Sequence, residues 1–309
     1  MRRVGILINH LRKSTENEGS GIATSEFLQY LNDAQERLQS QIFQTHPESD
    51  IFAKQGFIDI TSGTASYDLE TLKNSSGVSA SSRILSTNAM SLVERSDGSG
   101  SNDNYYPLQL ISNGEKSFGY GYILRDNVIT MVPEPNQSVT NGVRLTFFQK
   151  VNELDVRRGK IASISDGVSV SLTTSTYFET DEDMNDDWFS IVDLDGNVIQ
   201  EELRMEAFDN GTGVITCSTA LNAAVLADAT DYYVCLGKHT KTHSEMPPTC
   251  ERYLLAYVEK QIAMRDSSID SAMLESHLIK MELDIVALFA TNQNDAVQIP
   301  ITSTDMMIW

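Results

Sequence analysis

The sequence predicts an α+β fold: a helical bundle built from N- and C-terminal helices, with inserted antiparallel β-rich segments and an extended C-terminal tail. Apolar residues recur at helical spacing near both ends of the chain, which predicts the helices. Alternating runs and turn pairs fill the region between them, which predicts the strands. The 309 residues, 40% of them apolar, suffice for packed cores in about two domains.

Composition excludes several classes of protein. The chain has 43 acidic residues against 23 Lys and Arg, a net charge of −20. This balance argues against a protein that grips phosphate backbones or anionic membrane surfaces, because such binding needs clustered basic residues. No window approaches the ~18 apolar residues of a bilayer span. The three cysteines lack metal-type spacing, so we expect reduced thiols and a soluble, unsecreted chain.

Residues 1–54 are expected to hold the N-terminal helices. The apolar stretch at the start ends at Ile8, too early for a signal peptide, and favours a short amphipathic helix. A second helix is predicted over residues 24–46, ending before Pro47. Its apolar stripe steps by four and three along Phe27, Leu31, Ala34, Leu38 and Ile42.

Two β-rich segments follow, over residues 55–160 and 161–243. In the first, Tyr120–Leu124 and Val128–Val132 flank an Asp-Asn pair and predict a hairpin. The second repeats short strands between turn signals, a rhythm typical of a small sandwich or barrel. These turn signals are Asp166-Gly167, Asp195-Gly196 and Asn210-Gly211.

Residues 244–292 are expected to form the C-terminal helices that complete the bundle. One seam on the last helix suits a partner helix, so we predict a subunit–subunit interface there. It consists of Leu274, Leu278, Met281, Ile285 and Leu288. A second stripe lies on an adjacent face, at Ile279, Leu283, Val286 and Ala290. A helix with two apolar stripes must be covered from two sides, by its own bundle or by a neighbouring subunit.

Residues 293–309 are predicted to form an extended arm that is polar before it ends in Met306-Met307-Ile308-Trp309. Exposing these four side chains would be costly, since their burial could contribute several kcal/mol at ~25 cal/mol per Å2. The arm therefore docks either on its own domain or on another protein.

Chemistry-bearing patterns are scarce, so we predict no catalytic, cofactor or metal site and no enzyme. The acidic stretch Asp181–Asp187 has Asp186 and Val192 where a calcium loop needs Gly and Glu, which favours a solvated loop. His239 and His243 are spaced by four but lack the intervening Glu of a metalloprotease helix. No nucleophile elbow or phosphate-cradling loop appears.

The order of several short motifs resembles that of a known family. After the helix at residues 24–46 come Tyr67-Asp68-Leu69, Tyr106-Pro107-Leu108, a hairpin ending Met131-Val132-Pro133, Arg144–Phe147 and Leu154–Gly159. With the late helices and the C-terminal tail, this order resembles the head-to-tail adaptor (connector) proteins of tailed bacteriophages. The resemblance covers about residues 20–160 and 245–309, and the segment at 161–240 departs from it.

The resemblance implies a structural virion protein of the neck, assembled in the host cytoplasm. Such a protein forms a ring, expected to be a dodecamer, that docks under the portal protein and lines the channel through which phage DNA passes without specific binding. It also provides the platform for a tail nozzle, tube or head-closure protein. The resemblance further implies that the arm binds the portal through Ile299, Ile301, Met307, Ile308 and Trp309.

Two rival functions remain open. The chain could be a phage tail or fibre-associated receptor- or carbohydrate-binding module, whose β-rich segment presents Tyr177, Trp188 and Tyr232 as a flat platform. Such aromatic residues are more often part of a core. The weaker rival is a hydrolase whose site is dispersed along the chain.

Overall fold

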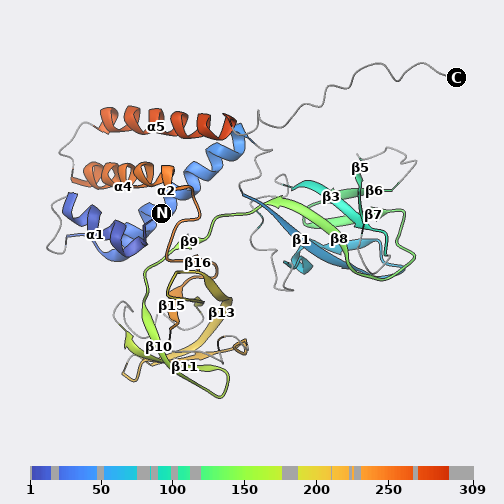
Figure 1. Cartoon of the computed structure of the whole chain (residues 1–309), viewed down its shortest axis with the longest axis horizontal. Helices are drawn as coiled ribbons and strands as arrows, with labels where there is room; N and C mark the ends of the chain where they lie inside the picture. The colour runs from blue at the N-terminus through green and yellow to red at the C-terminus, as the bar shows by residue number, and fades with distance from the viewer. Residues whose placement is uncertain are drawn as a thin grey trace. The chain divides into compact units, whose positions relative to one another are not determined.

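The chain divides into two compact units, which we describe one at a time. In the computed structural model, the first unit comprises Met1–Ile42 and Val151–Trp309, and the second comprises Phe43–Lys150. Figure 1 colours the chain from its N-terminus to its C-terminus. The structure describes residues 2–14, 21–46, 52–74, 84, 90–98, 104–111, 120–175, 187–209, 211–222, 225, 231–266 and 271–291.

The first unit contains the helices, which come from both ends of the chain (Figure 1). They are α1 (Val4–Ser14), α2 (Thr24–Thr45), α4 (Glu251–Asp266) and α5 (Ser271–Thr291), with a 3-10 turn η5 (Pro248–Cys250) before α4. The stripe predicted for α2 is confirmed, because all five of its residues are fully buried. Leu254, Val258 and Ile262 form the buried side of α4, as their spacing predicts.

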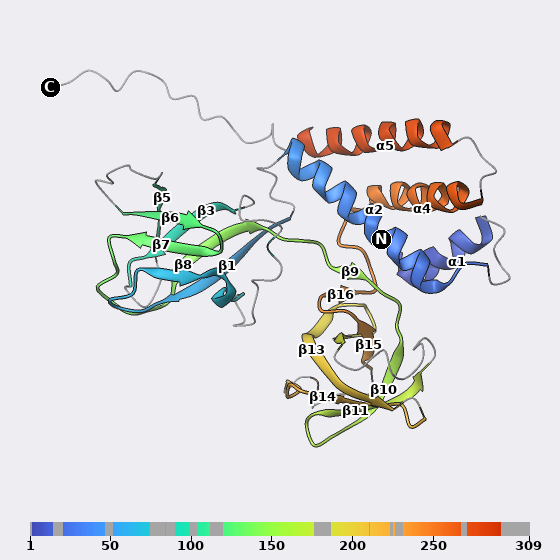
Figure 2. The same ribbon diagram turned by 180° about the vertical axis from the view of Figure 1, so that it is seen from behind.

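The same unit contains a closed antiparallel barrel. Its strands are β10 (Gly159–Ser165), β11 (Ser169–Ser175), β12 (Trp188–Val192), β13 (Val198–Asp209), β14 (Val214–Cys217) and β15 (Tyr233–Leu236). Their order around the barrel is β10-β11-β14-β13-β12-β15, and β15 pairs back with β10. Figure 2 shows these strands curving around a common interior. Apolar side chains fill that interior, among them Phe189, Ile191, Leu203, Met205 and Val234.

Two of the three predicted turn signals lie where the barrel chain reverses, and Asn210 of the third lies outside the described residues. Asp166 and Gly167 both have positive φ, at 55° and 70°, in the three-residue connection from β10 to β11. Aspartate and glycine are among the residues that tolerate this conformation in turns. Between β12 and β13, the Asp193 carboxylate accepts hydrogen bonds from the amides of Asp195 and Asn197, each at 2.8 Å. Local turn chemistry therefore sets the strand ends.

A short strand pair and buried hydrogen bonds connect the barrel to the helices of this unit. Strands β9 (Glu153–Leu154) and β16 (Thr240–Lys241) pair in parallel next to the barrel. The buried Gln35 side chain donates to the carbonyl oxygen of Asn152 at 2.8 Å and accepts from the hydroxyl of Ser244 at 2.6 Å. Because Gln35 lies on α2, its side chain fixes that helix to the segment with Asn152, which leads into β9, and to the segment with Ser244, which follows β16.

The second unit is built from two four-stranded sheets that share one core. One sheet has the order β1 (Ala53–Ile60), β8 (Val139–Phe148), β3 (Met90–Ser96) and β4 (Tyr105–Pro107). The other has the order β2 (Ser66–Asp68), β7 (Val128–Val132), β6 (Gly121–Arg125) and β5 (Gln109–Leu110), with a 3-10 turn η2 (Leu69–Thr71) after β2. The predicted hairpin is β6–β7. Both sheets contribute to the buried cluster, for example through Ile58, Leu145 and Met131.

The predicted fold class, a helical bundle with inserted β-rich domains and a C-terminal tail, is wrong. Of the described residues, 38% are in strands and 33% in helices, and one part of the chain closes into a six-stranded barrel. The barrel and the paired sheets each have a core of their own. Long helical stripes stand out in a sequence, whereas the short strands that build these cores find their partners far along the chain.

Candidate functional site

The buried side of α5, which packs against other helices of the first unit, is a narrow stripe. Leu278, Glu282, Ile285 and Phe289 step by four, three and four, and they are between 1% and 7% exposed. This helix packs on α4, and the two run side by side in Figures 1 and 2. One member of the stripe is a carboxylate, which requires polar partners when it is buried.

Glu282 finds those partners on two other helices. Its Oε1 accepts a 2.5 Å hydrogen bond from the hydroxyl of Tyr253 on α4 and lies 2.6 Å from Nε of Arg37 on α2. Burial, together with the bond to Glu282, raises the pKa of Tyr253 far above its usual range. Burial opposes the charge of Arg37, but its bond to Glu282 gives a net rise in the Arg37 pKa. The three helices are thus joined through one carboxylate, which fixes the orientation of α5.

A second charged pair lies beside this network. Lys260 of α4 contacts the carboxylate of Glu275 on α5, and Arg37 lies 3.4 Å from the same carboxylate. Burial and the nearby Arg37 lower the pKa of Lys260. These contacts further define which side of α5 faces the chain.

Two apolar flanks of α5 lie on either side of the buried stripe. A helix turns about 100° per residue. One flank therefore contains Ile279 and Leu283, which are 45% and 64% exposed, and the half-buried Val286. The other contains the half-buried Leu274 and Met281 and the 53% exposed Leu288. Figure 1 shows the helix that carries them.

The predicted site residues therefore separate in the structure. Leu278 and Ile285 belong to the stripe that packs within the chain, whereas Leu274, Met281 and Leu288 form one of the two flanks. A role of these five residues in contacts between subunits stays a prediction. The predicted portal-binding arm lies outside the described residues, at Ile299, Ile301, Met307, Ile308 and Trp309.

The network around Glu282 was not predicted from the sequence. The available signal was local: Glu282 is a charged residue at a step of four from Leu278 and of three from Ile285. A carboxylate at such a position predicts a buried polar contact. Its partners could not be identified in this way, because Arg37 lies 245 residues away along the chain.

The three cysteines are buried, and His239 is held by carboxylates. Burial raises the pKa of the Cys217 and Cys250 thiols to about 11, and raises the Cys235 pKa as well, so all three are protonated near neutral pH. His239 lies between two carboxylates, with Nδ1 3.1 Å from Glu201. Among the described residues, no group of three or more His, Cys, Asp or Glu could hold a metal ion. The acidic stretch Asp181–Asp187 lies outside them except for its last residue.

The aromatic platform of the rival hypothesis does not assemble from the described residues. Trp188 is 38% exposed, and Nζ of Lys238 lies 4.9 Å from its ring centre. Tyr232 packs against the core of the barrel, and Tyr177 lies outside the described residues. The described helices include none that is long and apolar enough to cross a membrane.

Comparison with known proteins does not identify a family. No protein-family model matches the chain, and a search of curated proteins finds no significant match. The resemblance seen in the sequence therefore stays a prediction.

Proposed function

We propose that the chain is a structural protein of a phage neck, a head-to-tail adaptor that assembles into a ring on the portal and contributes to the DNA channel. The observation that carries this proposal is the pair of apolar flanks on α5. A contact between identical copies around a ring is heterologous, so each copy needs two different surfaces. The flank with Ile279 and Leu283 and the flank with Leu288 provide two such surfaces on one helix.

The fixed orientation of α5 supports the same proposal. Because Glu282 holds the helix to Tyr253 and Arg37, the two flanks keep their directions relative to the rest of the first unit. Ring closure depends on a constant rotation between neighbours, and a helix held by polar contacts on two others presents its flanks reproducibly.

The apolar area of the flanks limits how strongly two copies can associate. Burying the exposed parts of Ile279, Leu283 and Leu288 would contribute about 2–5 kcal/mol per contact. Association costs about 4–15 kcal/mol in lost translational and rotational freedom. The flanks alone are therefore too weak to hold a ring, and we expect copies to assemble when a portal brings them together.

The charge of the chain is compatible with a channel protein. A net charge of −20 repels the phosphate backbone, which lets DNA slide past without binding specifically. A structural role also fits the chemistry of the described residues, whose cysteines are buried and protonated near neutral pH.

The test is assembly on a portal. The full chain and the portal protein encoded in the same genome are mixed, and complexes are sized by light scattering and viewed by electron microscopy. We expect a monomer when the chain is alone and rings when the portal is present. Leu283→Asp places a charge in one flank and is expected to abolish rings while circular dichroism stays unchanged.

Met273 offers a matched control on the same helix. It is 73% exposed and lies opposite the buried stripe, outside both flanks, so Met273→Asp should leave ring formation intact. Rings formed equally well by Leu283→Asp, or a wild-type chain that stays monomeric with the portal, would overturn the proposal.

A further inference from the structure

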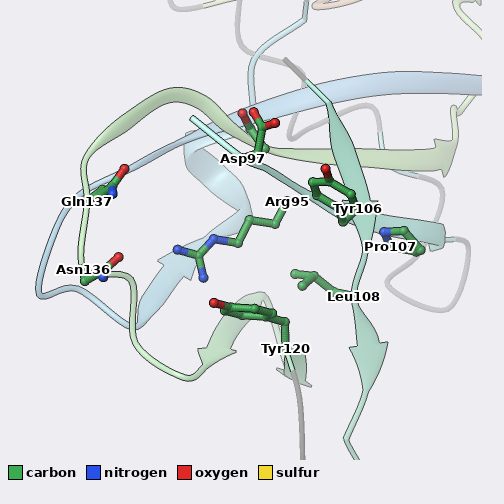
Figure 3. A pocket seen from close by; sticks show the side chains of 9 residues that line it. Arg95, Asp97, Tyr106, Pro107, Leu108, Tyr120, Asn136 and Gln137 are labelled. Carbon is green, nitrogen blue, oxygen red and sulfur yellow. The ribbon is translucent and has the colours of Figure 1, made fainter. Parts of the chain in front are cut away.

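The second unit contains a pocket of about 670 Å3 that the ring proposal does not use. Figure 3 shows the pocket at close range. Arg95 of β3 is paired with Tyr106 of β4, and cross-strand partners project from the same face of a sheet. Tyr120, just before β6, and the connection from β7 to β8 complete the lining. Its volume lies within the range of about 300–1,000 Å3 usual for small-molecule sites.

Aromatic rings form much of the accessible wall. Tyr106 is 58% exposed and Tyr120 is 65% exposed, whereas Leu108, which also lines the pocket, is only 8% exposed. Tyrosines this accessible contribute little to a core, so packing does not explain their presence here. The ring of Tyr120 is held on one side by Arg95, whose Cζ lies 5.3 Å from its centre. This contact orients both side chains before any ligand arrives.

Planar polar groups surround the rings. Figure 3 shows the Arg95 guanidinium reaching toward Asn136, with Gln137 near Asn136 and Asp97 at the top of the view between Gln137 and Tyr106. Amides both donate and accept hydrogen bonds, guanidinium only donates and carboxylate only accepts. The lining therefore offers both kinds of partner within one cavity.

The charge of the pocket restricts the ligand class. Among the described residues that line it, Arg95 and Asp97 are the charged ones, and their opposite charges sum to zero. A site for phosphate or another polyanion needs an excess of basic groups, and the chain as a whole carries −20. A neutral ligand with many hydroxyl groups matches this lining better than an ion does.

We propose that this pocket binds a short neutral oligosaccharide. A sugar ring has an apolar C–H face that packs on an accessible aromatic ring, and hydroxyls at its edge that bond to amide, guanidinium and carboxylate groups. Tyr106 and Tyr120 provide the rings, and Arg95, Asp97, Asn136 and Gln137 provide the polar groups. The site lies within the second unit and does not depend on ring assembly by α5.

Binding is tested on the full chain with defined probes. Maltohexaose, cellohexaose and chitohexaose are titrated by calorimetry and by NMR with fluorinated tyrosine, and polygalacturonate serves as the acidic probe. We expect at least one neutral hexaose to bind and to shift the tyrosine resonances. Tyr120→Ala and Tyr106→Ala should each weaken that binding by about tenfold, because an aromatic stacking surface is lost.

Two further variants separate loss of the site from loss of the fold. Tyr120→Phe keeps the ring and should retain binding within about twofold. Leu110 is 55% exposed on the neighbouring β5 but does not line the pocket, so Leu110→Ala should change nothing. Failure of every neutral probe, binding of the acidic probe alone, or binding unaffected by both alanine variants would overturn the proposal.

Discussion

The hydroxyl of Tyr253 donates a 2.5 Å hydrogen bond to the buried carboxylate of Glu282. The same carboxylate is paired with Arg37, so one acidic side chain connects α2, α4 and α5. A buried carboxylate is tolerated when two partners bind it. Removing either partner leaves it incompletely bonded, which lowers the free energy of unfolding.

Removing that hydroxyl should therefore weaken the fold. Tyr253→Phe leaves the carboxylate with one donor fewer, and we expect a loss of about 1–3 kcal/mol of unfolding free energy. Urea titration measures the change. Tyr257 lies on the same helix, with its ring under Arg37 at 5.9 Å. Tyr257→Phe keeps that ring and should cost less than about 0.5 kcal/mol; equal costs for the two variants would show that the bond to Glu282 is unimportant.

Two leucines of α5 should respond differently to the same substitution. Leu278 is 1% exposed, so Leu278→Asp buries an unpaired charge and should destabilise the chain by about 3–5 kcal/mol. Leu283 is 64% exposed, and Leu283→Asp should change stability by less than about 0.5 kcal/mol. Thermal unfolding distinguishes the two. A stable Leu278→Asp variant would mean that the buried stripe of α5 is assigned to the wrong face.

A glycine in the turn between β12 and β13 cannot accept a side chain. Gly196 has a φ of 87°, and an added Cβ would lie 2.3 Å from Oγ1 of Thr242. We expect Gly196→Ala to cost about 2–4 kcal/mol, from backbone strain and from the clash. Gly167 has a φ of 70° with nothing near the added atom, so Gly167→Ala should cost about 1 kcal/mol. Comparable losses in chemical denaturation would argue against the close approach.

Stability should depend on pH through His243. Burial, with Arg3 and Arg157 nearby, lowers the pKa of this imidazole below 6.5. Between the folded and unfolded pKa values, the unfolded chain binds more protons. Acidification therefore reduces stability, starting near pH 6.5, until the pH falls below the folded pKa.

His243→Gln removes this contribution. The difference in unfolding free energy between wild type and variant should change as the pH falls from about 7 to 5, with the wild type losing more. Carboxylates that titrate in the same range are common to both proteins and cancel in the difference. Parallel stability curves would contradict the prediction.

The sequence predicted local elements well and long-range arrangement poorly. The helix α2 has a strict periodic stripe, and the turn at Asp166-Gly167 has residues that favour positive φ, so both follow from neighbouring residues. Barrel closure instead depends on pairs such as Lys160 with Tyr233. No local pattern specifies such a pair, so the sequence predicted a sandwich or barrel without its strand order. The predicted fold class was wrong because it made the periodic helices the main architecture of a chain that is mostly β.

The two proposed sites also differ in how far the sequence predicted them. The flanks of α5 were visible as two apolar stripes, although the sequence could not show that Leu278 packs inward while Leu283 stays exposed. The pocket of the second unit was not predicted. Arg95, Tyr106 and Tyr120 come from separate strands and strand ends, and only the pairing of β3 with β4 places the first two together.

Closure of the barrel limits the ways in which molecules of this chain can aggregate. Each of its six strands has a partner on both sides, so the barrel offers no free backbone edge for strand-to-strand aggregation. The sheets of the second unit end in β1, β4, β2 and β5. Of these, β5 has only two residues, and Pro107 in β4 lacks an amide hydrogen. The eight-residue β1 is the longest of these edges, and Phe57 within it already exchanges two backbone hydrogen bonds with Lys73, which limits further strand pairing there.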